Sequence, residues 1–174
     1  MKRDIACRRL MGEDADAFAQ LRREIAFDNP VPLGLTVDEE LSRPLEGFRS
    51  QLSYPLPNAA FGAFEDGRLV GSAAVAWPGK FPSSRHKAEL WGVFVSPGQR
   101  GNGIGRRLVG MALDHAFGAG ARRVNLTVYL PNDAAVALYR SLGFVACGTE
   151  PEAVCLGGIF HDGLQMSLLR PGGK

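Results

Sequence analysis

The chain has 174 residues, of which 45% are hydrophobic and 22% charged, with a formal net charge of +2. This length suits one domain, expected over residues 1–174, which can bury a core without a disulfide or metal. Such a small charge excludes the basic field that nucleic-acid binding usually requires. The charged start, residues 1–4, has no following apolar region of a signal peptide, and no apolar run approaches the ~18 residues of a membrane span. We therefore expect a soluble cytoplasmic protein that binds neither nucleic acid nor membrane.

Three cysteines, Cys7, Cys147 and Cys155, are widely spaced along the chain. An odd and scattered set predicts neither a disulfide framework nor a metal site, and it favours a reducing compartment. The three histidines are equally scattered. We therefore expect no bound metal, and we expect the cysteines to pack as small hydrophobic side chains.

The first half of the chain predicts a strand, two helices and a hairpin. Thr36 and Glu39 form a capping box, in which each side chain bonds the other residue's backbone N–H group, and this starts the second helix. Asp66 and Gly67 separate two apolar runs, and both residues tolerate the positive φ of a tight hairpin turn. The expected elements are a strand at 3–10, helices at 14–27 and 36–52, and strands at 59–64 and 69–77.

The second half alternates strands and helices around a glycine-rich turn. The expected elements are a strand at 88–95, the turn at 96–105, a helix to about Gly118, a strand at 123–130, a helix at 132–142, and strands at 145–149 and 159–169. This order predicts a mixed sheet with helices on its faces and one strand–loop–helix–strand unit at its centre.

The glycine-rich turn holds Gly98, Gly101, Gly103 and Gly105 between a strand and a helix. Glycines let the backbone turn sharply and let a ligand approach closely. The helix start adds unpaired N–H groups and a partial positive charge, which suit a phosphate. Arg100 can add a charged contact. A turn that merely connects two elements is the alternative interpretation.

Two common phosphate motifs do not fit this turn. A Walker A loop requires a Lys directly after the glycines, and none is present. A dinucleotide fingerprint counted from Gly101 requires a glycine where Arg106 stands. No acidic residue lies about 20 residues further on to hold a ribose.

The turn resembles motif A of the GNAT superfamily of N-acetyltransferases, Gln/Arg-x-x-Gly-x-Gly/Ala, at Arg100-Gly101-Asn102-Gly103-Ile104-Gly105. A second segment, Asn132 to Phe144, is similar to motif B of that family, Asn-x-x-Ala-x-x-Leu-Tyr-x-x-x-Gly-Phe. The interval between the motifs fits one helix and one strand, as in the family. The similarity covers about residues 59–146, and at both ends only the order of elements agrees.

The resemblance implies an α/β (mixed α+β) fold. Its sheet of about seven strands is mixed and mostly antiparallel, with helices on both faces and a splayed strand pair that holds coenzyme A. It also implies acetyl-CoA as co-substrate, with the pyrophosphate on the loop amides and the pantetheine arm along the preceding strand. The residues assigned to the cofactor are Val93, Phe94, Val95, Arg100, Gly101, Asn102, Gly103, Ile104, Gly105, Asn132, Ala135 and Tyr139.

Tyr139 is the candidate acid for the leaving thiolate. It follows Asn132 by two helical turns on the same face. The resemblance places its hydroxyl beside the cofactor sulfur, where it can protonate or hydrogen-bond the thiolate. A backbone N–H of Phe94 or Val95 is the implied donor to the oxyanion. The alternative for Tyr139 is an amphipathic core residue, and for Asn132 a helix cap alone.

Glu89 is the candidate general base. An alternating strand would place Glu89, Trp91, Val93 and Val95 on one face, so apolar neighbours would raise the pKa of the carboxyl group. The alternatives are a solvated or ion-paired Glu89 and a base formed by a chain of water molecules, which the family often uses.

The sequence therefore predicts an acetyl-CoA-dependent N-acetyltransferase that transfers acetyl directly to a primary amine in a ternary complex. A non-catalytic coenzyme A sensor or scaffold, or a nucleotide-binding regulatory domain, are the alternatives. The acceptor amine, on a small molecule or a protein, has no readable motif. A homodimer is implied by the resemblance alone.

Overall fold

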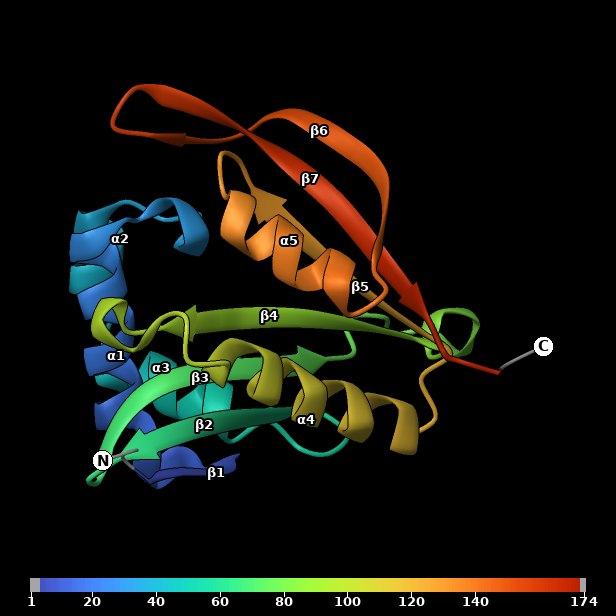
Figure 1. Cartoon of the computed structure of the whole chain (residues 1–174), viewed down its shortest axis with the longest axis horizontal. Coiled ribbons are helices and arrows are strands. Elements are labelled where there is room, and N and C mark those ends of the chain that lie inside the picture. Colours follow the sequence, from blue (N-terminus) through green and yellow to red (C-terminus); the bar gives the residue numbers. More distant parts are fainter. Residues whose placement is uncertain (1–3, 173–174) are drawn as a thin grey trace.

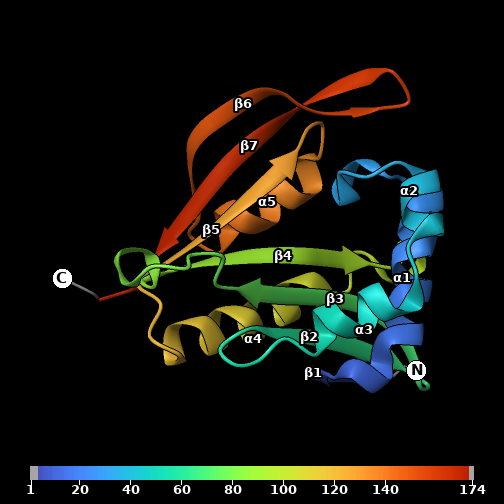
Figure 2. The same ribbon diagram turned by 180° about the vertical axis from the view of Figure 1, so that it is seen from behind.

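A single seven-stranded sheet forms the centre of the molecule (Figure 1, Figure 2). The computed structural model describes residues 4–172, so the predicted first position of strand 3–10 lies outside the described residues. The strand order is β1-β2-β3-β4-β5-β7-β6, and every adjacent pair is antiparallel except β4 and β5. The strands are β1 (Ile5–Leu10), β2 (Ala59–Glu65), β3 (Arg68–Ala76), β4 (Lys87–Val95), β5 (Arg123–Tyr129), β6 (Val145–Leu156) and β7 (Ile159–Leu169).

Helices cover both faces of the sheet, as expected. They are α1 (Ala15–Asp28), α2 (Val37–Ser42), α3 (Leu45–Leu52), α4 (Ile104–Gly118) and α5 (Asp133–Ser141). Helices α1 to α3 lie on one side, and α4 and α5 lie on the other (Figure 1, Figure 2). Two clusters of buried apolar side chains result, one under α1 and α3 and one under α4 and α5. None of the helices within residues 4–172 is long and apolar enough to cross a membrane.

The single helix predicted over 36–52 is wrong, because the chain forms α2 and α3 instead. The capping box is present, with the Thr36 hydroxyl accepting from the Glu39 amide at 3.2 Å. Helix α2 ends at Ser42. The next residue, Arg43, has an extended backbone, and Pro44 directly precedes α3. Proline lacks the N–H group that continues a helix, and it disfavours helical geometry in the residue before it.

Both hairpins turn on residues with positive φ. Asp66 and Gly67, at φ 48° and 80°, make the predicted turn between β2 and β3. The predicted strand at 145–149 is too short, because β6 continues to Leu156 and turns back at Gly157 and Gly158. Its pairing with β7 shifts between Glu150 and Val154. This irregularity removes the period-2 alternation by which a strand is recognised.

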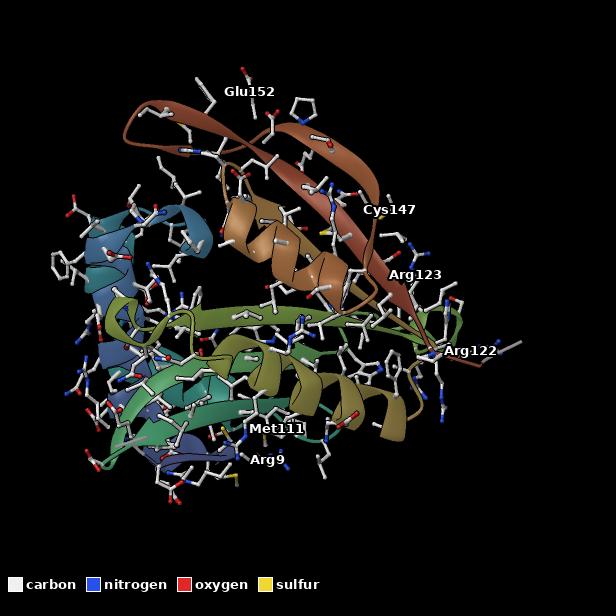
Figure 3. All side chains as sticks on the ribbon, in the orientation of Figure 1. Arg9, Met111, Arg122, Arg123, Cys147 and Glu152 are labelled. Carbon is white, nitrogen blue, oxygen red and sulfur yellow. The ribbon has the colours of Figure 1, made fainter. Side chains whose placement is uncertain are left out.

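Strands β4 and β5 form a fork. They pair only at Lys87–Glu89 and Arg123–Asn125. The carbonyl of His86 closes this end by accepting from the amides of Arg122 at 2.8 Å and Arg123 at 3.2 Å (Figure 3 labels both arginines). Beyond the paired end, the edge of β4 that faces β5 has no strand partner among the described residues. The expected splayed strand pair is therefore present.

A β-bulge in β4 lies where the fork opens. The register with β3 shifts between Ser72 and Ala74, opposite Gly92, whose φ is 62°. The buried Ser72 hydroxyl donates to the Gly92 carbonyl at 2.7 Å. A bulge adds one residue to its strand and bends it.

The bulge also changes which side chains of β4 lie on the same face of the sheet. Trp91 and Phe94 pack in the cluster under α1 and α3. Val93 and Val95 pack against the cluster under α4 and α5. The expectation that Glu89, Trp91, Val93 and Val95 share one face is therefore wrong, because the extra residue shifts the alternation between Trp91 and Val93.

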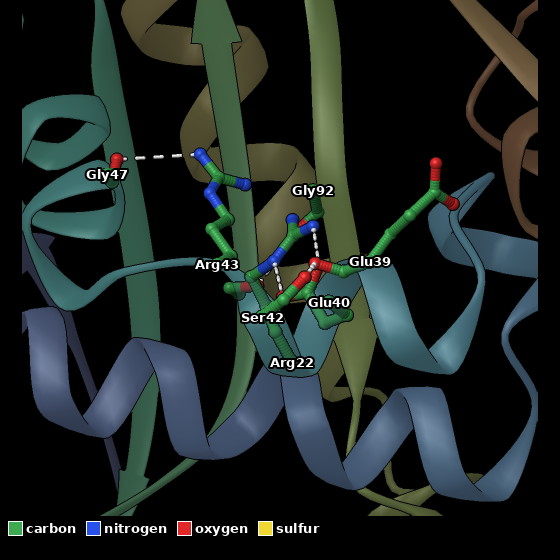
Figure 4. Close-up of polar contacts among 8 residues, drawn as sticks. Arg22, Glu39, Glu40, Ser42, Arg43, Gly47 and Gly92 are labelled. Atoms are coloured by element: carbon green, nitrogen blue, oxygen red, sulfur yellow. Dashed lines mark hydrogen bonds and ion pairs between the residues drawn. The ribbon is translucent and has the colours of Figure 1, made fainter.

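A buried ion pair joins α1 to α2 (Figure 4). The Arg22 guanidinium donates to both carboxylate oxygens of Glu40, at 2.7 and 2.8 Å. The two side chains are only 6% and 0% exposed. Three phenylalanine rings surround the guanidinium, those of Phe18, Phe48 and Phe94. This pair fixes the short helix α2 against α1 and β4.

The cysteines behave differently from one another. All three are free thiols; Cys7 is half-buried against the core, whereas Cys147 and Cys155 are exposed on β6. Cys147 and Glu152 lie on the β6–β7 hairpin, which extends beyond the helices (Figure 3). Small hydrophobic packing is therefore correct for Cys7 and wrong for the other two.

Candidate active site

A slot of about 410 Å³ runs between the glycine turn, β4 and α5. All the residues assigned to the cofactor line this slot except Asn102. Asn102 instead lines a larger cavity on the other side of the turn, and its side-chain amide donates to the Gln99 carbonyl at 3.4 Å. The fold thus brings the two motifs, more than 25 residues apart, to one cavity.

The glycine turn presents free amides to the slot. Gly101 and Gly103 have φ of 80° and 77°, a conformation that favours glycine. Gly103 caps α4, and its carbonyl accepts from Arg107 at 3.0 Å. The amides of residues 104–106 therefore have no partner within the helix, as at any helix start. Such amides, with the helix dipole, attract an anion such as a pyrophosphate.

Arg100 ties the turn to α1. Its guanidinium donates to the Val95 carbonyl at 3.1 Å and to the Asp28 carboxylate at 2.8 Å. The charged contact expected from Arg100 is thus directed to Asp28 in this structure. The backbone amides and the helix start remain as the anion-attracting groups of the turn.

The open edge of β4 supplies further hydrogen-bonding groups. Along a strand, successive N–H and C=O groups point to alternate edges, and each requires a partner or solvent. Beyond Glu89 the edge facing β5 has no strand partner among the described residues, and Val93, Phe94 and Val95 border the slot there. An extended ligand with amide groups can pair with this edge as a further strand would.

Tyr139 lies on the α5 side of the slot. The residue is 7% exposed, and its ring contacts that of Phe144 edge to face at 5.7 Å. Burial raises the pKa of the phenol above its usual value of about 10. The Asn132 side chain caps the helix by accepting from the Ala135 amide at 3.2 Å. Tyr139 is thus a core residue and Asn132 a helix cap, and both also line the slot.

A smaller chamber of about 60 Å³ lies inside the fork. Its walls are Leu90–Val93 of β4 and Leu126–Tyr129 of β5. The residues that it shares with the slot are Pro32, Val93, Asn132, Ala135 and Tyr139. The chamber therefore adjoins the slot on the side away from the glycine turn.

Glu89 lies elsewhere. It is exposed and lines neither the slot nor the chamber. It borders a third cavity of about 360 Å³ at the closed end of the fork, together with Lys87 and Asn125. The fold brings Tyr139 to the fork but does not bring Glu89 beside it.

Several slot residues were not predicted from the sequence. Ile25, Asn29 and Pro32 come from the end of α1 and from the connector between α1 and α2, residues 29–36. They reach the slot only through tertiary packing, so no local pattern marks them. Leu138 and Ala134 lie within motif B, and their place on α5 is the signal that could have indicated them.

Comparison with curated proteins finds relatives over much of the chain. N-alpha-acetyltransferase RimI of Mycobacterium tuberculosis is 41% identical over 105 residues, 60% of this chain and 63% of RimI. An uncharacterized protein of Mycobacterium leprae is 38% identical over 140 residues, 80% of this chain and 34% of that protein. The chain thus spans less than two thirds of the length of these two relatives.

The fold is also that of a solved acetyltransferase. The phosphinothricin acetyltransferase of Sinorhizobium meliloti, solved in complex with acetyl-CoA, superposes with a TM-score of 0.82 at 21% identity and covers 98% of this chain and 90% of that one. The model of the acetyltransferase (GNAT) family matches residues 19–144, which include the glycine turn, the fork and α5. The chain belongs to the acetyltransferase (GNAT) family.

Proposed function

We propose that this protein, as one domain, is an N-acetyltransferase that transfers acetyl from acetyl-CoA directly to a primary amine in a ternary complex. The observation that carries the proposal is the slot, which joins free loop amides, an unpaired strand edge and a buried tyrosine in one cavity. Family membership and the acetyl-CoA complex of the structural neighbour support it. The acceptor is an amine of a small molecule or a protein.

The slot fits the parts of coenzyme A in order. The free amides at the start of α4 suit the pyrophosphate. The open edge of β4 at Val93–Val95 suits the amides of the pantetheine arm. The thioester then lies near Tyr139, where the slot meets the chamber.

The reaction forms a C–N bond and breaks a C–S bond. The neutral amine attacks the thioester carbonyl carbon, the coenzyme A thiolate leaves, and the amine loses one proton as the thiolate gains one. A backbone N–H of Phe94 or Val95 stabilises the oxyanion. An amine with a pKa near 10.4 costs about 4–5 kcal/mol to deprotonate at pH 7, so the site must assist this step.

Tyr139 acts as a hydrogen-bond donor to the leaving thiolate. A thiol with a pKa of about 8.5 is a stronger acid than this buried phenol, so complete proton transfer from Tyr139 is unfavourable while a hydrogen bond is not. Tyr139→Phe should lower kcat by roughly tenfold, the effect of losing one hydrogen bond to a charged group, and leave the Kd of acetyl-CoA unchanged. Steady-state kinetics and calorimetry measure the two quantities. An unaltered kcat would return Tyr139 to a packing role.

The same phenol sets an expectation for the pH dependence. Tyr139 donates only when neutral, which is below its pKa, and burial moves that pKa above the usual value of about 10. The Tyr139 hydroxyl therefore loses its proton, and with it the ability to donate, only above about pH 10. Between about pH 8 and pH 10, ionisation of Tyr139 should therefore not lower the kcat of the wild-type protein. The pH profiles of kcat for the wild type and Tyr139→Phe should have the same shape in this range.

Glu89 lies outside the chamber, so it cannot contact the attacking amine directly. It removes the amine proton through intervening water molecules. Glu89→Gln should lower kcat/KM by about a hundredfold and remove the acidic limb of its pH profile, because the limb reports ionisation of the base. Asp133→Gln, on an exposed acid of α5, is the control. An acidic limb that persists in Glu89→Gln would assign the base to another group.

Calorimetric titration of the purified protein tests the proposal, with acetyl-CoA as ligand and ATP and NAD as controls. Selective binding of acetyl-CoA, followed by amine-dependent release of the thiol, is the expected result. Binding without release for any amine would favour a coenzyme A sensor or scaffold. Folded protein that fails to bind acetyl-CoA would refute the proposed function.

A further inference from the structure

We propose that Tyr129 determines acyl-group size: its ring, held in place by Gly34, closes the chamber so that it admits acetyl and rejects longer acyl groups. The inference rests on the proposed function, since it assigns the chamber to the acyl end of the thioester. It concerns two residues outside both sequence motifs, one at the end of β5 and one in the connector between α1 and α2.

The position of the chamber assigns it to the acyl group. The slot begins at the free amides of the glycine turn, where the pyrophosphate binds, and on its opposite side it adjoins the chamber, with which it shares Pro32, Val93 and Tyr139. A thioester bound with its sulfur near Tyr139 therefore directs its acyl group into the chamber. The chamber, at about 60 Å³ against about 410 Å³ for the slot, leaves little room beyond a short group.

Gly34 packs directly against the ring of Tyr129. A Cβ atom at residue 34 would overlap Cε2 of the ring and lie only 2.9 Å from its Cζ. Gly34 also has φ of 64°, which favours glycine for a second, independent reason. The short turn Val31–Leu33, which precedes Gly34, brings the connector from α1 to β5. Pro32 in this turn lines the chamber. The connector and the tyrosine ring form one wall.

The wall cannot yield easily to a longer chain. The backbone of Tyr129 is held by the pairing of β5 with β7, which runs along the whole of β5 and includes Tyr129 with Gly163. The neighbouring chamber residues Leu126 and Val128 are buried in the core cluster. Extra methylenes in a filled and well-supported space force side chains and backbone to shift. A longer acyl group must therefore displace the Tyr129 ring, and with it the connector.

Binding of an acyl-CoA series without acceptor tests the inference. Calorimetry would compare acetyl-, propionyl- and butyryl-CoA, with coenzyme A itself as the reference. Wild-type protein should bind butyryl-CoA at least about tenfold more weakly than acetyl-CoA, the scale of discrimination by a filled apolar pocket. Tyr129→Ala should reduce this ratio to about threefold or less. Tyr129→Phe, which keeps the ring, should retain the wild-type ratio.

Two further variants keep the test decisive. Tyr54→Ala removes an exposed ring outside the slot and should leave the ratio unchanged. Tyr129→Leu keeps an apolar contact with Gly34, so it serves if Tyr129→Ala does not fold, and its ratio should fall between those of Ala and wild type. Equal wild-type binding of acetyl- and butyryl-CoA, or a ratio that neither Tyr129→Ala nor Tyr129→Leu lowers, would overturn the inference. Failure to bind acetyl-CoA at all would instead refute the proposed function.

Discussion

Gly103→Glu is expected to abolish measurable binding of acetyl-CoA. The substitution places a carboxylate at the cap of α4, where the free amides point. Two like charges about 4 Å apart near a protein surface repel by roughly 4 kcal/mol. This corresponds to a loss of about a thousandfold in affinity. Calorimetry with acetyl-CoA measures the loss directly.

The same substitution at Gly120 is its matched control. Gly103 and Gly120 lie beyond opposite ends of α4, at φ of 77° and 96°, and neither has an atom within 4 Å of the position of a Cβ. Each variant therefore carries similar backbone strain, of about 1–2 kcal/mol. Gly120→Glu should lose stability without losing affinity for acetyl-CoA. If both variants bound acetyl-CoA like the wild type, the glycine turn would not be the phosphate site.

Arg22→Met should lower the free energy of unfolding by about 3–5 kcal/mol. The substitution leaves the Glu40 carboxylate without its partner at a position where its side chain is 0% exposed. The double variant Arg22→Met/Glu40→Leu removes both charges and should recover most of the loss, because the surrounding phenylalanine rings can pack against apolar side chains. Urea denaturation of the three proteins measures the differences.

An exposed ion pair supplies the control for Arg22. Arg49 and Glu46 pair at 3.1 Å with side chains 49% and 70% exposed. Arg49→Met should change the free energy of unfolding by less than about 1 kcal/mol, since solvent screens such pairs. A similar cost for Arg22→Met and Arg49→Met would show that burial adds nothing to the value of the Arg22–Glu40 pair.

The glycine turn and the hairpin at Asp66–Gly67 could be predicted because their signals are local. In both places a few residues must adopt positive φ, and the glycines that allow it stand in the sequence itself. The capping box at Thr36 is local in the same sense. The resemblance to the two family motifs then predicted most of the slot lining on β4 and α5.

The environment of Glu89 could not be predicted, because it depends on a single extra residue in the strand. Side chains from Glu89 to Val95 would alternate between the two faces of the sheet only in a regular strand. The bulge opposite Ala73 interrupts this alternation. Gly92, a glycine within an apolar strand, was the available sign of this bulge.

Contacts between distant segments left no sign at all. Pro32 and Gly34 reach the fork, and Arg22 meets Glu40, only after α1 and α2 have packed on the sheet. Propensity and periodicity describe neighbours along the chain, whereas these pairs are decided by tertiary packing.

The fork divides the molecule into two parts that are also consecutive in the sequence. Strands β1 to β4 with α1 to α4 precede residue 119, and β5 to β7 with α5 follow residue 122. The chain crosses between the parts once, and the sheet joins them through three residue pairs, Lys87–Glu89 with Arg123–Asn125. A ligand in the slot contacts both parts, for example Gly103 in the first and Tyr139 in the second.

Such a ligand acts as a cross-link between the two parts. Any ligand that binds only the folded chain stabilises it by mass action, by about 2.7 kcal/mol at a concentration one hundred times its Kd. Here the ligand would contact both sides of the β4–β5 boundary, which within residues 4–172 has three paired residues on each strand, fewer than any other strand pair of the sheet. A ligand that binds across the fork would therefore also hold the two parts together where β4 and β5 do not pair.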